Sequence, residues 1–282
     1  MTHVAAGVLR GYLDGTRAGA LWLEYDSYAQ RVFANGAADW LSQPSRFANT
    51  MVQARKAIRS DVVTVDITAA ALASMPAGDD PVERCRMALG DEAGRRFAAD
   101  CIDAILHKLA REIDLVLRVP SPRNLLMRCG QEGEPDFDQL DEVATAIVSS
   151  LRTHADRNIG GLLLTRDSSA PLSADEADAH GPVLNAAHHY GWVTCLSLPG
   201  VLVAGGTVEV DDVDLLLCGD LPQARIRALR GQGRALGGGI PPALWSATGE
   251  VPTRAADDLL FGVVPVDANP ETVLARCASL SN

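Results

Sequence analysis

The chain has 282 residues, of which 47% are hydrophobic and 22% are charged, so it is long enough to bury one large core. Its 36 acidic and 25 basic residues give a net charge of −11, which argues against nucleic-acid binding, since that class of protein carries a basic face. No apolar run approaches the roughly 18 residues that span a bilayer, and the N-terminus lacks a signal-peptide pattern. We therefore expect a cytoplasmic protein with a small-molecule substrate, and neither nucleic acid nor membrane as partner.

Six cysteines are scattered along the chain without a Cys-x-x-Cys pair: Cys85, Cys101, Cys129, Cys195, Cys218 and Cys277. Disulfide frameworks belong to short secreted chains, whereas cysteine inside an apolar run behaves as a small hydrophobic residue. The histidines show no spacing typical of metal ligands either. We therefore predict reduced core thiols, no zinc on Cys129, Cys195 or Cys218, and no metal or other cofactor.

Short apolar runs recur eight times in the chain. They are Ala20–Tyr25, Val62–Asp66, Asp114–Val119, Gly161–Thr165, Trp192–Leu198, Val213–Cys218, Arg234–Gly239 and Leu260–Val266. Most are continuous rather than alternating, which is typical of parallel strands buried on both faces. Eight strand–helix units in 282 residues predict a (β/α)8 TIM barrel, α/β in class, as a single domain over residues 1–282. An open doubly wound sheet is the alternative.

Segments between these runs predict helices at Val4–Leu13, Pro44–Ile58, Pro81–Arg111, Asp136–Arg152, Ser173–Tyr190 and Pro270–Leu280. The first is an extra helix in front of the barrel. Ser173 and Glu176 form a capping-box pattern at the start of their helix. The stretch Ile67–Asp80 is predicted to be an irregular loop, and Val201–Asp212 is too short for a full helix.

The active site of such a barrel is built from the loops that follow the strands. This rule selects Glu24, Asp26, Tyr28, Arg31, Asp66, Arg123, Asn124, Arg166, Asp167, Ser197, Asp220, Gly238 and Asp267. Asp66 is the strongest candidate, because it interrupts an apolar strand with a carboxylate whose burial would be costly if it were unpaired. Asp167 and Asp267 have a helix-capping alternative. Arg166 is predicted to clamp a substrate carboxylate or to form an ion pair.

Two further motifs have both a functional and a structural interpretation. The glycines Gly237–Gly239 follow the seventh run, where they would expose N–H groups to an anion or simply let the chain turn. They lack GxGxxG spacing and a P-loop lysine, so nucleotide binding is weakly supported. The pair His188-His189 ends a helix, where a dipole role is favoured over catalysis.

Four segments, in the right order, resemble the uroporphyrinogen decarboxylase superfamily. Pro44–Ile58 with Ser60–Ile67 is similar to the family's helix and second strand ending in Asp-Ile, and Gly160–Ser168 resembles its fourth strand near an Asp-Ser pair. Gly233–Pro241 resembles the strand that carries Gly-Asn-Leu-Asp-Pro, and Asn269–Val273 its proline-containing step into the last helix. The resemblance implies a TIM barrel and, from the family's decarboxylases, a homodimer.

The chain departs from the motifs that carry the family's chemistry. Leu23–Arg31 has acids where the decarboxylases have an Arg-Gln-Ala-Gly-Arg segment for substrate carboxylates, so a porphyrinogen substrate is disfavoured. Gly-Asn-Leu-Asp-Pro has become Gly-Gly-Gly-Ile-Pro. Ser197–Gly200 replaces the His-x-Cys-Gly zinc motif of the superfamily's cobalamin-linked methyltransferases, and neither Ser nor Pro can replace thiolate or imidazole.

Our leading hypothesis is a metal-independent lyase of the decarboxylase type that acts on a small organic acid, in specialised metabolism. The resemblance implies an acid/base or cation-stabilising role for Asp66. Tyr28 would position the substrate, and Arg31, Arg123 or Arg166 would hold its carboxylate. The alternatives are a methyltransferase with an altered metal site and a non-catalytic ligand-binding descendant of the fold.

The predicted catalytic residues are Asp66, Tyr28 and Arg166, and the predicted substrate-binding residues are Glu24, Arg31, Arg123, Asn124, Asp167, Ser197 and Gly238. Glu24, Tyr28, Asp66 and Arg166 are expected to converge on one pocket of mixed sign. Such a lining suits a substrate with one carboxylate and a basic or hydroxyl group.

Overall fold

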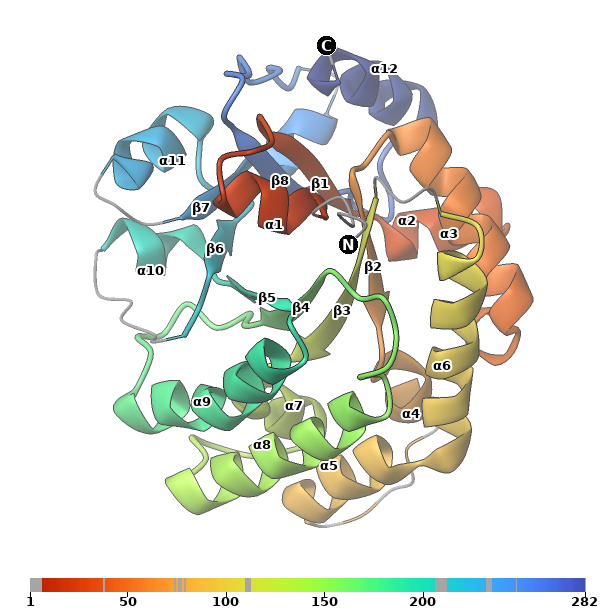
Figure 1. Ribbon diagram of the computed structural model, residues 1–282, viewed down its shortest axis with the longest axis vertical. Helices are drawn as coiled ribbons and strands as arrows, with labels where there is room; N and C mark the ends of the chain where they lie inside the picture. Colours follow the sequence, from red (N-terminus) through yellow and green to blue (C-terminus); the bar gives the residue numbers. More distant parts are fainter. Residues whose placement is uncertain are drawn as a thin grey trace, which may run out of the picture.

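The computed structural model describes residues 7–37, 39–73, 75, 78, 80–109, 113–205, 212–231, 235–246 and 248–281. Eight parallel strands form a barrel with the neighbour order β1-β8-β7-β6-β5-β4-β3-β2, and helices surround it (Figure 1). The strands are β1 (Ala20–Glu24), β2 (Val62–Asp66), β3 (Asp114–Pro120), β4 (Gly161–Thr165), β5 (Val193–Ser197), β6 (Leu215–Cys218), β7 (Leu236–Ile240) and β8 (Leu259–Val263). The predicted (β/α)8 barrel and all eight of its strands are confirmed.

The seam between β1 and β2 is closed differently from the other strand pairs. Parallel ladders join the seven other neighbouring pairs. At this seam the Asp61 amide donates to the Leu21 carbonyl at 2.7 Å, and the Leu23 amide donates to the Ser60 hydroxyl at 3.1 Å. Residues just before β2 therefore hold β1 in place at its N-terminal half.

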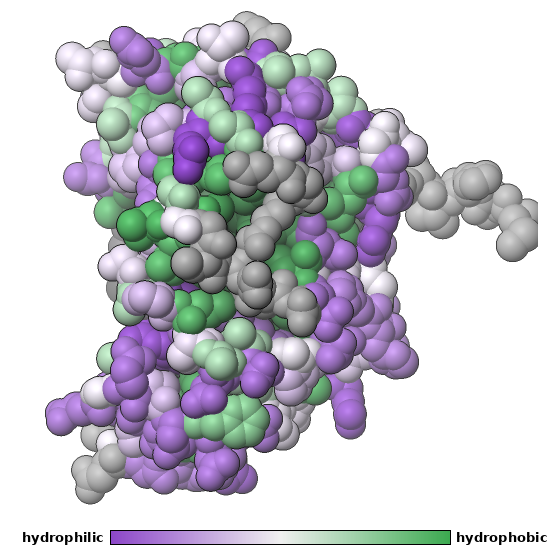
Figure 2. All heavy atoms as spheres, turned by 90° about the vertical axis from the view of Figure 1, so that its left-hand side faces the viewer, coloured by the Kyte–Doolittle hydropathy of each residue, from purple (hydrophilic) through white to green (hydrophobic). Residues whose placement is uncertain are grey.

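The helices are α1 (Val8–Leu13), α2 (Asp26–Phe33), α3 (Pro44–Ile58), α4 (Ala69–Ala73), α5 (Pro81–Gly90), α6 (Glu92–Leu106), α7 (Pro122–Arg128), α8 (Phe137–Arg152), α9 (Ala174–His189), α10 (Gly200–Ala204), α11 (Gln223–Arg230) and α12 (Pro270–Leu280), with short 3-10 turns at Trp40–Ser42 and Pro242–Trp245. Helix α10 has only five residues. On the face that carries α10 and α11, hydrophobic side chains gather in the middle of the surface and hydrophilic ones toward its ends (Figure 2).

The structure corrects two predictions between the strands. Pro81–Arg111 is not one helix, because the helix is interrupted at Asp91. The Asp91 carboxylate accepts the Gly94 amide at 2.7 Å and caps the start of α6. The stretch Ile67–Asp80 is not wholly irregular, since it contains α4. Residues 4–6, 110–111 and 234, at the ends of predicted elements, lie outside the described residues.

The barrel interior and the helix layer form two separate hydrophobic clusters. Alternate residues of each strand point inward, and Val8 and Leu9 of α1 join the inner cluster. The Leu9 amide donates to the carboxylate of Asp114, at the start of β3, at 2.8 Å. Helix α1 thus closes the N-terminal end of the barrel, and it lies close to β1 and β8 in Figure 1.

The predicted core thiols are confirmed, because all six cysteines are buried and free. Among the described residues, no helix combines the length and the apolarity that crossing a membrane requires.

A hydrogen bond inside the barrel supports the floor of the C-terminal mouth. Trp22 donates its indole N–H to the Thr64 hydroxyl at 3.0 Å, and its ring meets Phe261 edge-on. Thr64→Val keeps the shape but leaves this buried donor without a partner, so we expect a loss of about 1–3 kcal/mol of unfolding free energy in denaturant titrations. Thr50→Val is the control, because it removes the hydroxyl of another buried threonine, in α3, without affecting the Trp22 indole.

Candidate active site

Five consecutive strands carry a polar side chain at or near their C-terminal ends: Glu24, Asp66, Arg118, Thr165 and Ser197. Each stands two positions after a residue that lies inside the barrel, and side chains along a strand alternate with a period of two. All five therefore point into the C-terminal mouth. The active site of a TIM barrel lies at this end.

Arg118 of β3 is the centre of the group. Its Nη1 is 2.9 Å from Glu24 Oε1, and its Nη2 is 2.6 Å from Asp26 Oδ2. Its Nε and Nη2 lie 3.3 and 3.2 Å from Asp66 Oδ2. The register explains the last contact, because Asp66 and Arg118 are paired on neighbouring strands. We refer to Glu24, Asp26, Asp66 and Arg118 as the mouth cluster.

The mouth cluster holds three carboxyl groups against one guanidinium. Burial alone would lower the pKa of Arg118, but Glu24, Asp26 and Asp66 hold that pKa well above its ordinary value. Burial raises the pKa of the Glu24 carboxyl, and Asp26 and Asp66 act in the same direction, against Arg118. The surroundings of Glu24 thus favour its neutral, proton-carrying form.

A cavity of about 240 Å³ adjoins the mouth cluster. Its polar wall includes Asp26, Asp66 and Arg118, and its apolar wall includes Trp40, Phe47 and Phe97. The other oxygen of Asp66, Oδ1, accepts the Thr68 amide and hydroxyl at 2.9 and 2.7 Å. Asp66 therefore faces a cavity at the C-terminal end while also capping the turn that follows β2.

The β8 side of the mouth is apolar. Val263, the last residue of β8, lies in register with Glu24 and is 51% exposed. A molecule bound in the mouth would therefore contact carboxyl groups on the β1 and β2 side and an apolar side chain on the β8 side.

The four residues that were expected to share one pocket do not all meet. Glu24 and Asp66 come together on Arg118. Tyr28 lies in the core on α2, 1% exposed, with the Arg31 guanidinium 5.9 Å from its ring centre. Arg31 itself donates to the Ala268 carbonyl. The structure thus places Tyr28 and Arg31 in the helix layer.

Arg166 and Arg123 are both engaged in bidentate ion pairs. Arg166 donates to the two oxygens of Glu176 at 2.6 and 3.0 Å, and its side chain is fully buried. The predicted capping box of α9 is therefore half formed: Ser173 accepts the Glu176 amide, but the Glu176 carboxylate binds Arg166. Arg123 binds Glu134 at 2.9 and 2.6 Å, and that glutamate side chain is 70% exposed. Arg123 can accordingly exchange Glu134 for another anion, whereas the ion pair of Arg166 with Glu176 is buried in the core.

The other predicted substrate-binding residues have separate surroundings. Asn124 is buried and donates to the Thr165 carbonyl at 3.0 Å, at the rim of the mouth. Asp167 is exposed and lies 3.4 Å from Arg128. Gly238 lies within β7 and faces α11, because a Cβ there would meet the Cys218 carbonyl and the Ile226 side chain. Of the predicted substrate-binding residues, Glu24 and Ser197 are those whose side chains point into the mouth.

Arg118 was absent from the sequence-based candidates although the signal for it was present. It interrupts an apolar strand, Leu115 to Val119, as Asp66 interrupts the strand before it. The argument that a buried charge needs a partner applies equally to both residues. Applied to both, it would have predicted their contact.

Among the residues that the structure describes, no group of three or more His, Cys, Asp or Glu side chains is arranged to hold a metal ion. In the mouth cluster the guanidinium of Arg118 lies between the three carboxyl groups. The absence of a metal from the reaction stays a prediction.

No protein-family model matches the chain. No curated protein matches it in sequence. Among solved structures, a methyltransferase from Methanosarcina mazei is similar with a TM-score of 0.61 and 13% identity, over 96% of this chain and 96% of that one. An amidohydrolase from Burkholderia ambifaria with bound Zn gives a TM-score of 0.44 and 10% identity, over 86% of this chain and 79% of that one. The first likeness establishes the fold alone.

Proposed function

We propose that this barrel is a metal-independent lyase of the decarboxylase type, with Glu24 as its proton donor. The observation that carries the proposal is the buried Glu24 carboxyl beside Arg118, Asp26 and Asp66 at the C-terminal mouth. A carboxyl group whose pKa is raised by burial next to a cavity is a candidate general acid or base, and Arg118, which contacts Glu24, lines the cavity of about 240 Å³. We also propose that the chain is a divergent member of the uroporphyrinogen decarboxylase superfamily, which the barrel fold supports.

The proposed step needs a proton and an electron acceptor. When the bond between the substrate carbon and its carboxylate breaks, CO2 leaves and the electron pair stays on the carbon. Neutral Glu24 gives that carbon its proton and is then reprotonated from solvent. The substrate itself must delocalise the electron pair, through a carbonyl group or an aromatic ring. Asp66 and Asp26 hold Arg118, and Arg118 fixes the Glu24 carboxyl.

The mouth also indicates the kind of substrate. Arg118 is fully occupied by carboxyl groups, so it is not free to bind the substrate's own carboxylate. A basic or hydroxyl group suits the carboxyl groups, and an apolar part suits Val263 beside Glu24. For the substrate carboxylate we propose Arg123 of α7, the helix that follows β3. Its side chain would turn from Glu134 toward the mouth, since Glu134 is exposed and exposed ion pairs are weak.

A panel of small keto acids and hydroxylated aromatic acids tests this proposal by release of CO2 and by mass spectrometry. We expect turnover that persists after dialysis against EDTA. Methyl transfer, or activity only with added metal, would contradict the proposal. Asp66→Asn then separates catalysis from binding: loss of turnover with unchanged substrate affinity supports an enzyme, and unchanged turnover in the folded variant removes Asp66 from the mechanism.

A further inference from the structure

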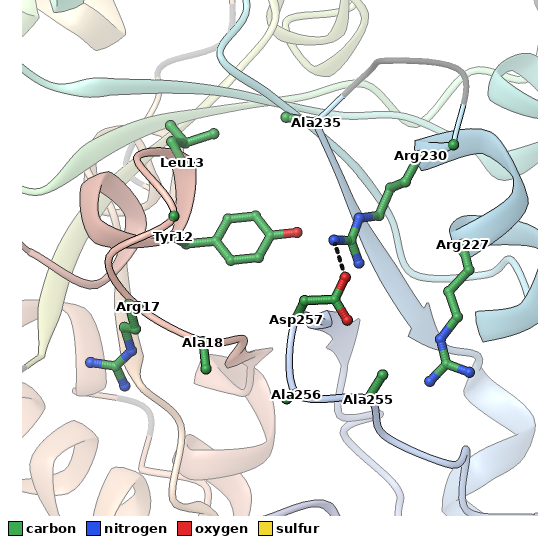
Figure 3. A pocket seen from close by; sticks show the side chains of 12 residues that line it. Tyr12, Leu13, Arg17, Ala18, Arg227, Arg230, Ala235, Ala255, Ala256 and Asp257 are labelled. Atoms are coloured by element: carbon green, nitrogen blue, oxygen red, sulfur yellow. Dashed lines mark hydrogen bonds and ion pairs between the residues drawn. The ribbon is translucent and has the colours of Figure 1, made fainter.

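A cavity of about 1020 Å³ lies at the other end of the barrel (Figure 3). Its walls are Tyr12 and Leu13 of α1, the segment before β1, the end of α11, and the residues before β7 and β8. All the wall segments that lead into strands do so at the strands' N-termini. The cavity is therefore at the N-terminal face, away from the mouth cluster.

The charged side chains that line the cavity are three arginines and one aspartate: Arg17, Arg227, Arg230 and Asp257. Asp258, which pairs with both Arg227 and Arg230, is fully buried beneath them. Asp61, Asp257 and Asp258 pair with these arginines, but of the three carboxylates Asp257 alone lines the cavity. The cavity surface is therefore basic, in a protein whose net charge is −11. This sign of charge favours an anionic ligand.

The arginines keep capacity for a ligand. Arg17 contacts Asp61 through one terminal nitrogen at 3.1 Å, and Nη1 of Arg227 has no hydrogen-bond partner among the described residues. Arg230 binds Asp257 through one nitrogen at 2.9 Å, and the Asp257 side chain is 75% exposed. Such an exposed pair is weak, so an incoming anion can take the place of Asp257.

The rest of the wall suits a flat molecule. Small residues line much of it: Gly15, Ala18, Gly231, Ala235, Ala255 and Ala256. The Tyr12 ring extends from α1 toward Arg230, whose guanidinium lies 5.9 Å from the ring centre. An aromatic ring beside small residues offers a surface on which a planar group can stack.

From these features we propose that the N-terminal face carries a second ligand site for a small molecule that combines a planar ring with an anionic group. The anion binds Arg230 and Arg227 in place of Asp257, and the ring lies against Tyr12 and the small residues. A cavity of this size accommodates a ligand as large as a mononucleotide. The phosphate of a nucleotide and the carboxylate of an aromatic acid share this chemistry.

Calorimetric titration with two probes distinguishes the sources, adenosine monophosphate for the nucleotides and 4-hydroxybenzoate for the aromatic acids. We expect one of them to bind, and its uncharged counterpart, adenosine or phenol, to bind at least tenfold more weakly. Asp257→Asn removes the competing carboxylate and should tighten binding by about threefold, because the ligand no longer has to displace an exposed ion pair from Arg230. Binding of neither probe at millimolar concentration would overturn the proposal, as would weaker binding by Asp257→Asn.

Blocking variants show where the probe binds. Ala256→Trp and Ala18→Trp place an indole in the cavity at exposed positions, and each should abolish binding while the melting temperature is kept. Ala275→Trp, at an exposed position of α12 outside the cavity, is the matched control and should bind as the unmodified protein does. Unchanged binding by both blocking variants contradicts the assignment. Val263→Trp, which fills the C-terminal mouth, should leave probe binding unchanged, so this test is independent of the proposed reaction.

Discussion

Arg118→Met is expected to destabilise the protein by about 3–5 kcal/mol at pH 8, because removing one partner of a buried ion pair leaves uncompensated charge. The side chain of Arg118 is 18% exposed, and it is the cation that Glu24, Asp26 and Asp66 share. Without it, three carboxyl groups lie together at the barrel mouth with no counter-ion among these contacts. Unfolding in urea, followed by circular dichroism, measures the loss.

The dependence on pH identifies the cause of that loss. Acid protonates the carboxyl groups and removes their repulsion, so the difference between Arg118→Met and the unmodified protein should shrink as the pH falls from 8 toward 4. Arg17→Met is the matched control, since Arg17 is 36% exposed and its pair with Asp61 is worth about 0–1 kcal/mol. A loss from Arg118→Met below about 1 kcal/mol, or one that does not change with pH, would show that the cluster is not held by this charge.

The strands were predictable because burial on both faces leaves a signal in the sequence itself. Val62–Asp66 and Gly161–Thr165 have the same bounds in the sequence analysis and in the structure. The helix break at Asp91 was missed although it had a signal, because Gly90 and Asp91, residue types that end and begin helices, stand side by side there. The break depends on a local side-chain hydrogen bond and on the close approach of Gly94 to Ala71.

The candidate site was predictable only in part, because partners distant in the sequence decide which charges are free. Arg166 lies directly after a strand end, as a substrate clamp would, but Glu176 of α9 folds back and occupies it. Tyr28 and Glu24 are four residues apart, yet the start of α2 turns Tyr28 into the core. No periodicity in the sequence contains these contacts.

Glu24→Gln is expected to lower turnover by at least about 100-fold, since general acid–base groups contribute 10²–10⁴ to rates. The glutamine keeps the shape of Glu24 and can still accept a hydrogen bond from Arg118, but it cannot give up a proton. We therefore expect substrate affinity to change little while kcat falls. Glu83→Gln, at an exposed position of α5, is the matched control and should leave kcat unchanged.

The same variant separates catalysis from stability through pH. Because burial raises the pKa of Glu24, the folded state holds this proton more tightly than the unfolded state does. Stability of the unmodified protein should consequently fall as the pH rises from the ordinary carboxyl range through the raised pKa, since the folded state then loses its extra proton. Glu24→Gln lacks this dependence, so it should equal or exceed the unmodified protein in unfolding free energy at pH 8. Activity that requires neutral Glu24 should decline over the same pH interval. A variant that is less stable at pH 8 and still turns over substrate at the original rate would mean that Glu24 serves the fold and not the reaction.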